Sequence, residues 1–243
     1  MTDRAALLVL HSVAKSYGAL RVTDAVSLSV PEGQTLGILG PNGAGKTTLF
    51  NLISGDVRCD SGRIEYAGRD ITTLAAHQRC RAGIGRSYQV PQPFGHMTVF
   101  ENLVAAACFG AQQSEAQAWE TAFEVLTHTG LLAQANHAAG GLTLLNRKRL
   151  ELARALATRP KLLLLDEIAG GLTEHEARVL VQELQRIKAS GITMIWIEHV
   201  VHALMSLADR LLVLHFGQTL AEGEPRAVMR DANVRRVYMG LDA

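Results

Sequence analysis

The chain has 243 residues, of which 48% are hydrophobic and 19% are charged, and its formal net charge is +1. This length can bury the core of one large domain or two small ones, and the near-neutral charge argues against nucleic acid or anionic lipid as a partner. No apolar run reaches the length that spans a bilayer, and residues 5–10 are too short for a secretory signal and are predicted to be a first strand. Three widely spaced cysteines, predicted to be packing residues, fit a reducing cytoplasm: Cys59, Cys80 and Cys108.

Strands and turns are predicted for the N-terminal part of the chain. Apolar and β-branched residues favour strands at 9–13 and 22–30, and the sequence Pro-Glu-Gly at 31–33 favours a turn. A second strand-and-turn pattern follows at residues 62–68.

Between these segments lies the motif that predicts most about the chain. The sequence Gly-Pro-Asn-Gly-Ala-Gly-Lys-Thr at residues 40–47, the phosphate loop, fits the pattern G-x-x-x-x-G-K-[ST]. An apolar run at 35–39 precedes it as a predicted strand, and residues 48–53 continue as a predicted helix. This order places backbone N–H groups and a helix N-terminus around an anion. A chance glycine-rich turn with a solvated lysine would not explain these flanks.

The phosphate loop therefore predicts a site for a nucleoside triphosphate. The glycines at 43 and 45 let the backbone approach phosphate oxygens without a Cβ clash. Lys46 is predicted to be the positive charge at the β- and γ-phosphates, and the Thr47 hydroxyl is predicted to be a ligand of Mg²⁺. The predicted nucleotide contacts in this segment are Gly40, Pro41, Asn42, Gly43, Ala44, Gly45, Lys46, Thr47 and Thr48.

Helices are predicted next, followed by alternating strands and helices. Residues 98–158 are rich in Ala, Leu and Gln at helical spacing and are expected to be an insertion. Beyond residue 161, alternation around a phosphate loop predicts a parallel sheet with helices on both faces. The predicted strands are 162–165, 193–197 and 211–214, and the predicted helices are 174–189 and 202–208.

Two acids end the strand of four leucines at 162–165. Asp166 is predicted to hold Mg²⁺ through water, and Glu167 is predicted to take a proton from the attacking water. Apolar strands often end in acidic turn residues, which is the structural alternative. Their place downstream of a phosphate loop favours the catalytic role, and a general base of this kind contributes about 10²–10⁴ in rate.

In this order of motifs the chain resembles ATP-binding-cassette (ABC) ATPases, the cytoplasmic motor subunits of membrane transporters. The resemblance covers residues 1–243 as a single ATPase domain. It implies an α/β fold of the P-loop NTPase (RecA-like) type with a parallel sheet core. It also implies an N-terminal antiparallel β subdomain and an α-helical subdomain inserted at roughly residues 95–160.

The resemblance extends to four further positions. Tyr17 matches the aromatic residue on which adenine stacks, although an edge-strand tyrosine is the alternative. Gln89 matches the glutamine that touches Mg²⁺ and senses the transmembrane subunit, although a plain loop residue is the alternative. His199 matches the switch histidine at the γ-phosphate, although a satisfied surface histidine is the alternative. The sequence Gly-Gly-Leu at 170–172 matches the loop that crosses between two subunits.

A narrower resemblance is to the ATPases of branched-chain amino acid importers. It rests on the amino-acid sequence at residues 83–89, 93–94 and 97–102, much of which is shared by relatives that transport urea or amides or export lipids. It implies ATP and Mg²⁺ as cofactors and a peripheral location at the cytoplasmic face of the inner membrane. It also implies a second ABC ATPase subunit (as a hetero- or homodimer), two transmembrane permease subunits and an extracytoplasmic substrate-binding protein, without nucleic acid.

One segment departs from the family. Where the family has its Leu-Ser-Gly-Gly-Gln signature, this chain has Leu142, Thr143, Leu144, Leu145 and Asn146, the signature segment. Glycine there lets N–H groups at a helix N-terminus approach the γ-phosphate of ATP held by the partner. A weakened but occupied signature is favoured here, which would slow hydrolysis of the partner's ATP. The alternative is a helix that only packs, with residues 147–149 as a solvated face.

Rival functions are also possible for a phosphate-loop protein. A soluble cassette acting in DNA repair usually carries long coiled-coil insertions, and one acting on the ribosome usually has two cassettes. A small-molecule kinase would need an acceptor pocket and not the series of Gln89, signature helix and His199. A non-hydrolysing structural subunit would not need Glu167.

Overall fold

The computed structural model describes residues 5–239, and the chain divides into two compact units. The first unit takes in the described residues up to Ala76 together with those from Thr193 onward, and the second unit is His77–Ile192. Within the described part of the chain, no helix has both the length and the apolar character needed to cross a bilayer.

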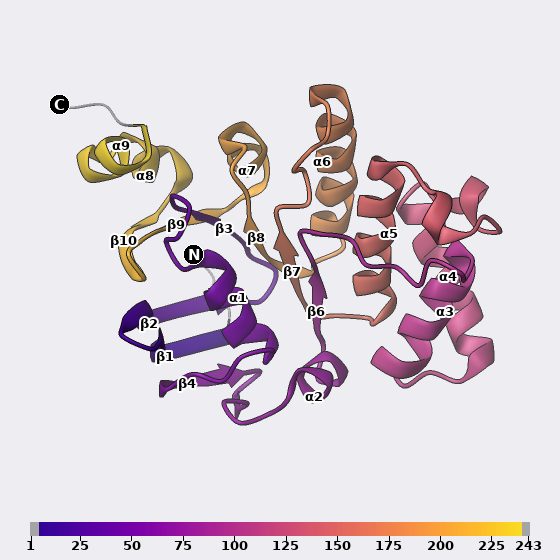
Figure 1. The fold of residues 1–243 in the computed structure, drawn as a ribbon, viewed down its shortest axis with the longest axis horizontal. Helices are drawn as coiled ribbons and strands as arrows, with labels where there is room; N and C mark the ends of the chain where they lie inside the picture. The colour runs from indigo at the N-terminus through magenta and orange to yellow at the C-terminus, as the bar shows by residue number, and fades with distance from the viewer. Residues whose placement is uncertain (1–4, 240–243) are drawn as a thin grey trace. The chain divides into compact units, whose positions relative to one another are not determined.

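An antiparallel sheet occupies the N-terminal part of the first unit (Figure 1). Its strand order is β2 (Leu20–Pro31), β1 (Ala6–Tyr17), β4 (Ser61–Tyr66) and β5 (Arg69–Asp70). Alternate side chains of β2 are buried from Val26 to Val30, which is the pattern of an antiparallel sheet with one covered face. The strands predicted at 9–13 and 22–30 lie inside β1 and β2 and are shorter than the observed strands. The first strand predicted at 5–10 begins one residue before β1, and the strand-and-turn pattern predicted at 62–68 overlaps β4 and extends two residues beyond its end.

A second set of strands in this unit carries the phosphate loop. The strand order is β10 (Gln218–Gly223), β9 (Arg210–His215), β3 (Thr35–Leu39) and β8 (Thr193–Ile197). β3 pairs in parallel with both β8 and β9, and all side chains of β3 and β8 are buried, which explains their continuous apolar sequences. β10 was not predicted: it is polar, and it forms by antiparallel pairing with β9.

The described residues of the first unit form four helices, which can be followed in Figure 1. α1 begins at Lys46, within the last two residues of the phosphate loop, and α7 follows β8, as the alternation of the sequence predicts. Two short helices after β10 were not predicted, and they contact β10. The bounds are α1 (Lys46–Ser54), α7 (Val201–Leu207), α8 (Pro225–Arg230) and α9 (Ala232–Met239).

The second unit combines two parallel strands with a group of helices. β6 (Ile84–Ser87) and β7 (Leu162–Asp166) are paired, and α5 (Leu144–Ala157) contacts both. α3 (Val99–Gly110), α4 (Glu115–His128) and α5 contact one another, and Figure 1 shows them side by side. The bounds of the other helical segments are α2 (Ala76–Arg81), η1 (Leu132–Gln134), η2 (Ala139–Gly141) and α6 (Glu174–Ala189).

Capping residues explain where three of these helices begin. Thr98, Ser114 and Thr173 each accept a hydrogen bond from the backbone N–H three residues later. The side chain of that later residue accepts a hydrogen bond from the backbone N–H of the cap residue, so each pair forms a complete capping box. α3, α4 and α6 are therefore fixed at their first residue by local sequence.

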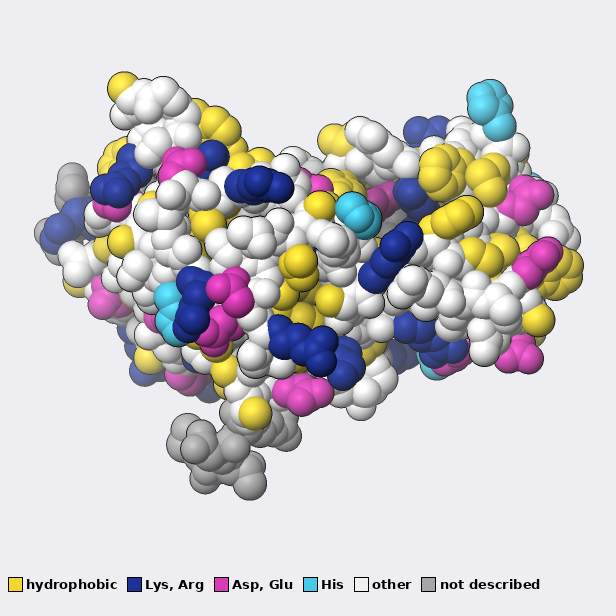
Figure 2. Space-filling view, turned by 90° about the horizontal axis from the view of Figure 1, so that it is seen from below, with side chains coloured by type: hydrophobic (Ala, Val, Ile, Leu, Met, Phe, Trp, Pro, Cys, Tyr) yellow, Lys and Arg dark blue, Asp and Glu magenta, His cyan; other side chains and the backbone are white. Residues whose placement is uncertain are grey.

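Charges of both signs are mixed on the face that Figure 2 shows. In the view of Figure 2, Lys and Arg side chains lie next to Asp and Glu side chains rather than in a separate block. Exposed aromatic residues occur in the second unit, where Phe94, Phe109, Trp119 and Phe123 are each more than half exposed.

Candidate active site

The phosphate loop wraps the N-terminus of α1 in the first unit. Gly45 is the N-cap residue with a φ of 98°, and no side chain among the described residues caps the helix there. A Cβ at Gly45 would lie 2.4 Å from the carbonyl oxygen of Val22, so only glycine fits. Gly43, with a φ of 80°, faces open space on the exposed side of the loop. The loop thus presents a helix N-terminus and an accessible backbone, as an anion site requires.

Lys46 lies over this loop. Its side chain is buried, and Nζ donates hydrogen bonds to the carbonyl oxygens of Gly40 at 2.7 Å and Pro41 at 3.1 Å. The next residue, Thr47, is exposed. A buried ammonium next to an exposed hydroxyl suits a phosphate and its counter-cation, so these residues fit a nucleoside triphosphate.

The turn between β9 and β10 supports the loop from behind. The N–H of Gly217 donates to the carbonyl oxygen of Ala44 at 3.1 Å, and the N–H of Asp24 donates to the carbonyl oxygen of Gly217 at 2.8 Å. A Cβ at Gly40 would lie 2.4 Å from the carbonyl oxygen of Leu214. Contacts distant in sequence therefore fix a loop whose own residues carry little side-chain packing.

Tyr17 and His199 also belong to the first unit. Tyr17 ends β1 with its side chain 49% exposed, and the ammonium of Lys15 lies 5.6 Å from its ring centre. Asp60 holds this strand end, because it accepts bonds from Lys15 Nζ and from the N–H of Ser16. His199 is exposed after β8, with its N–H bonded to the carboxylate of the buried Glu198.

The second unit brings Gln89 and Glu167 together. Gln89 Nε2 donates to Glu167 Oε2 at 2.5 Å, although 78 residues separate them in the chain. Glu167 has a φ of 46°, in the left-handed region that non-glycine residues rarely adopt. Such strain costs about 1–3 kcal/mol and concentrates at functional sites.

Asp166 lies next to Glu167 at the end of β7, and its carboxylate is paired with an arginine. Arg86 Nη2 lies 3.1 Å from Asp166 Oδ2, and both side chains are nearly fully buried. Arg86 also stacks on Tyr88, with its guanidinium carbon 4.6 Å from the ring centre. Sequence reasoning did not single out Arg86. The signal that could have found it is one charge inside a short strand paired with the strand that ends in Asp166.

The signature segment forms the start of α5. Thr143 is the N-cap residue, and its Oγ1 accepts a bond from the N–H of Asn146 at 3.4 Å. Leu144 is 46% exposed, and its Cδ2 lies 3.3 Å from the position that a Cβ on Gly171 would take. The side chain of Leu144 is thus directed toward the loop that follows Glu167.

The alternative of a solvated face at residues 147–149 is wrong for Lys148. This residue is only 4% exposed, and Nζ donates to the carbonyl oxygens of Gln89 at 2.6 Å and Glu167 at 3.2 Å. Arg149 is also mostly buried and forms an ion pair with Glu183 of α6. Successive helix positions differ by about 100° in direction, so three adjacent cations cannot share one environment.

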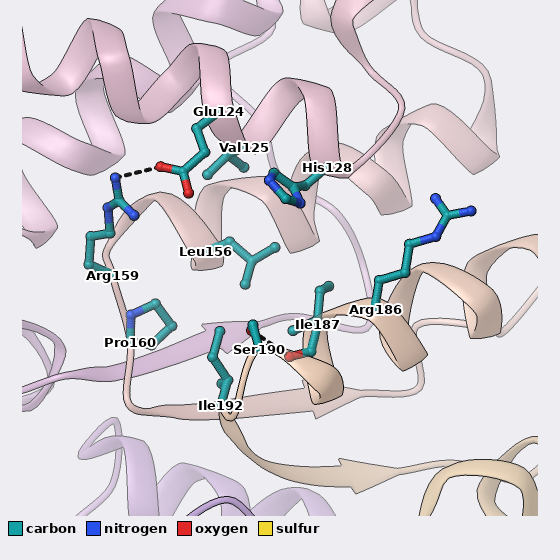
Figure 3. Close-up of a pocket in the computed structure, with 10 residues that line it drawn as sticks. All are labelled: Glu124, Val125, His128, Leu156, Arg159, Pro160, Arg186, Ile187, Ser190 and Ile192. Carbon is teal, nitrogen blue, oxygen red and sulfur yellow. Dashed lines mark hydrogen bonds and ion pairs between the residues drawn. The ribbon is translucent and has the colours of Figure 1, made fainter.

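A separate pocket of about 310 Å³ lies in the second unit (Figure 3). Val125, Leu156 and Ile187 form part of its apolar wall, while Arg159 and Glu124 are ion-paired at 2.7 Å. No residue predicted for the nucleotide site lines it. Its full lining is Glu124, Val125, His128, Leu156, Arg159, Pro160, Arg186, Ile187, Ser190 and Ile192.

Comparison with known proteins places the chain in a family. The family described as "ABC transporter" matches residues 23–170. The lipopolysaccharide export ATP-binding protein LptB of Haemophilus influenzae is 35% identical over 234 residues, 96% of this chain and 97% of that protein. The probable branched-chain amino acid transport ATP-binding protein LivG of Methanocaldococcus jannaschii is 33% identical over 256 residues, 99% of this chain and 100% of that protein.

Solved structures agree with these sequence matches. A nucleotide-free ATP-binding cassette from an ABC transporter has a TM-score of 0.87 at 32% identity, covering 98% of this chain and 100% of that chain. The predicted α/β P-loop NTPase fold is thereby confirmed. With its phosphate loop intact, the chain belongs to the ABC transporter ATPases, as an ATP-binding and ATP-hydrolysing motor subunit.

Proposed function

We propose that this ATPase drives import of branched-chain or related amino acids from the cytoplasmic face of the cell membrane. The substrate class is supported by the amino-acid sequence at residues 83–89, 93–94 and 97–102, together with the similarity to LivG. Two permease subunits and an extracytoplasmic binding protein complete such an importer.

Lipid export is the second candidate, because LptB of Haemophilus influenzae is as similar as LivG. The two candidates share the ATPase chemistry and differ only in the permease that ATP hydrolysis drives. Residues of the ATPase alone therefore do not distinguish the two substrates.

An uptake experiment separates these candidates. In cells lacking the gene, uptake of radiolabelled leucine is expected to fall to the level without ATP-driven import. The wild-type gene should restore uptake, and a Glu167→Gln gene should not. Unchanged leucine uptake with less lipopolysaccharide at the outer surface would contradict amino acid import and support lipid export.

In the proposed reaction the first unit supplies the contacts to the nucleotide. Lys46 and the N–H groups of the phosphate loop balance the negative charge of the β- and γ-phosphates. Tyr17, half exposed at the end of its strand, offers a ring for the adenine base, and His199 contacts the γ-phosphate. These groups position the nucleotide and do not change covalently.

The second unit supplies the general base. Glu167 accepts a proton from the attacking water, and Gln89 holds the carboxylate through the 2.5 Å hydrogen bond. Thr47, Gln89 and Asp166 would hold Mg²⁺ bound with ATP, and the ion would supply positive charge at the phosphates.

The active assembly is proposed to contain two cassettes arranged head to tail. The signature segment of each chain contacts the ATP held by the other chain, at the N-terminus of α5. The side chains of Leu144 and Leu145 leave the γ-phosphate less room to approach the backbone N–H groups there than two glycines would. With a partner whose signature is intact, ATP on this chain's phosphate loop is hydrolysed efficiently and the partner's ATP slowly.

Restoring one glycine tests this steric argument. In a preparation of this chain alone, Leu145→Gly is expected to raise ATP turnover by about tenfold, which corresponds to about 1.4 kcal/mol of added transition-state binding. The measurement is the steady-state release of inorganic phosphate. Leu145→Ala is the matched control, since it removes bulk but keeps a Cβ and should give a smaller gain. Equal turnover in all three proteins would disprove the steric argument.

A further inference from the structure

One face of α5 holds the segment that contains Gln89. Lys148, Glu151 and Arg154 follow one another at intervals of three residues, so they lie on the same side of the helix. Arg154 Nη1 donates to the carbonyl oxygen of Gln92 at 2.8 Å. Glu151 accepts from the N–H groups of Tyr88 and Gln92, and burial raises the pKa of this carboxyl.

Lys148 differs from the other two residues because it reaches two separate segments. Its ammonium joins the carbonyl oxygen of Gln89, at 2.6 Å, to the carbonyl oxygen of Glu167, at 3.2 Å. The side chains of these same two residues are joined by their own hydrogen bond of 2.5 Å. Gln89 and Glu167 are therefore linked twice, once through their side chains and once through a cation between their backbones.

The contact at Glu167 falls on a strained residue. With a φ of 46°, the backbone of Glu167 needs support from its surroundings to persist. That support comes from the N–H of Gly170, 3.1 Å from the carbonyl oxygen of Glu167, and from the Lys148 ammonium. A charged donor makes the stronger of two such bonds at equal geometry. The direction of the Glu167 side chain follows from this backbone conformation.

We propose that Lys148 is a positioning residue for hydrolysis: its ammonium holds the backbones of Gln89 and Glu167 so that the Glu167 carboxylate points at the attacking water. This inference rests on the proposed role of Glu167 as general base. Lys148 touches neither nucleotide nor water in this scheme. It acts through the two residues whose carbonyl groups it bonds.

The expected result of removing the Lys148 ammonium is a lower kcat with little change in KM. A misplacement of a catalytic group by about 1 Å can cost about 100-fold in rate. Lys148→Met removes the charge and keeps the length, so it should lower kcat by about 100-fold. The phosphate loop is unaltered, so the KM for ATP should stay within about threefold of the wild-type value. Lys148→Arg keeps a buried cation and its donors and should retain most of the wild-type kcat.

The experiment measures phosphate release at varied ATP with Mg²⁺, using whichever form turns over faster, the chain alone or the chain mixed with a second cassette ATPase. Lys161→Met is the matched control, because Lys161 is exposed. Lys148→Met is also combined with Glu167→Gln. Because both act on one group, the double variant should be no more than about twofold slower than Glu167→Gln alone.

Each outcome decides one question. Wild-type kcat in Lys148→Met, or an additive loss in the double variant, would overturn the positioning role. If Lys148→Met does not fold, as judged by its thermal midpoint, Lys148→Gln replaces it: an intermediate kcat supports the role and a wild-type kcat overturns it. If Glu167→Gln leaves turnover unchanged, the proposed general base fails instead, so the two failures are distinguishable.

Discussion

Glu167→Gln is expected to lower ATP turnover by about 10²–10⁴, the range that a general base contributes. Glutamine keeps the shape of the side chain and can still accept the hydrogen bond from Gln89 Nε2, so the site should keep its geometry. It cannot take a proton from water. ATP binding by the phosphate loop should persist, because Lys46 and the N–H groups of that loop are unchanged.

The measurement pairs phosphate release with equilibrium binding of a fluorescent ATP analogue. Glu120→Gln, which neutralises an exposed acid of α4, is the control and should leave both values unchanged. Loss of turnover with binding retained supports the assignment. Turnover close to wild type would mean that another group accepts the proton. Loss of binding as well would point to a structural role for Glu167.

The second large effect is expected at Lys46. Lys46→Met should reduce kcat by about 10²–10³, the loss seen when one preorganised donor to a developing charge is removed. It should also weaken ATP binding by at least about tenfold, since a charged contact worth about 1.4 kcal/mol or more is lost. Its two bonds to loop carbonyls are lost too, so the loop itself becomes less ordered.

Binding of the fluorescent ATP analogue and phosphate release together check this prediction. Lys161→Met again serves as the charge-matched control. Unlike Glu167→Gln, the Lys46 variant should lose binding and turnover together. A variant that binds ATP as tightly as the wild-type chain would show that the loop amides alone hold the phosphates.

The elements that local sequence determines were predictable. The phosphate loop, α6 and β8 follow from glycine spacing, helical periodicity and a continuous apolar run, each contained within one short segment. β6 was not predicted, because Ile-Gly-Arg-Ser at 84–87 has one large apolar residue and becomes a strand only by pairing with β7. β10 depends in the same way on β9.

The candidate site shows the same division. The residue types at Lys46, Asp166 and Glu167 indicate their chemistry directly, because few other roles need them at that spacing. Arg86 and its partner Asp166 are 80 positions apart in the chain. Lys148 is 59 positions from Gln89 and 19 positions from Glu167. Sequence periodicity gives a side chain its direction on a helix but not its partner. The contacts of such residues can therefore be identified only from the folded structure.

The bare start of α1 has a consequence for the energetics of the whole chain. A serine or aspartate cap there would add about 1 kcal/mol to the stability of the protein. It would also occupy the donors that a phosphate needs, and the Val22 carbonyl leaves no room for it at position 45. The empty chain thus lacks the stabilisation that a capped helix start would provide. ATP acts as a removable cap that stabilises the folded state in proportion to the logarithm of its concentration.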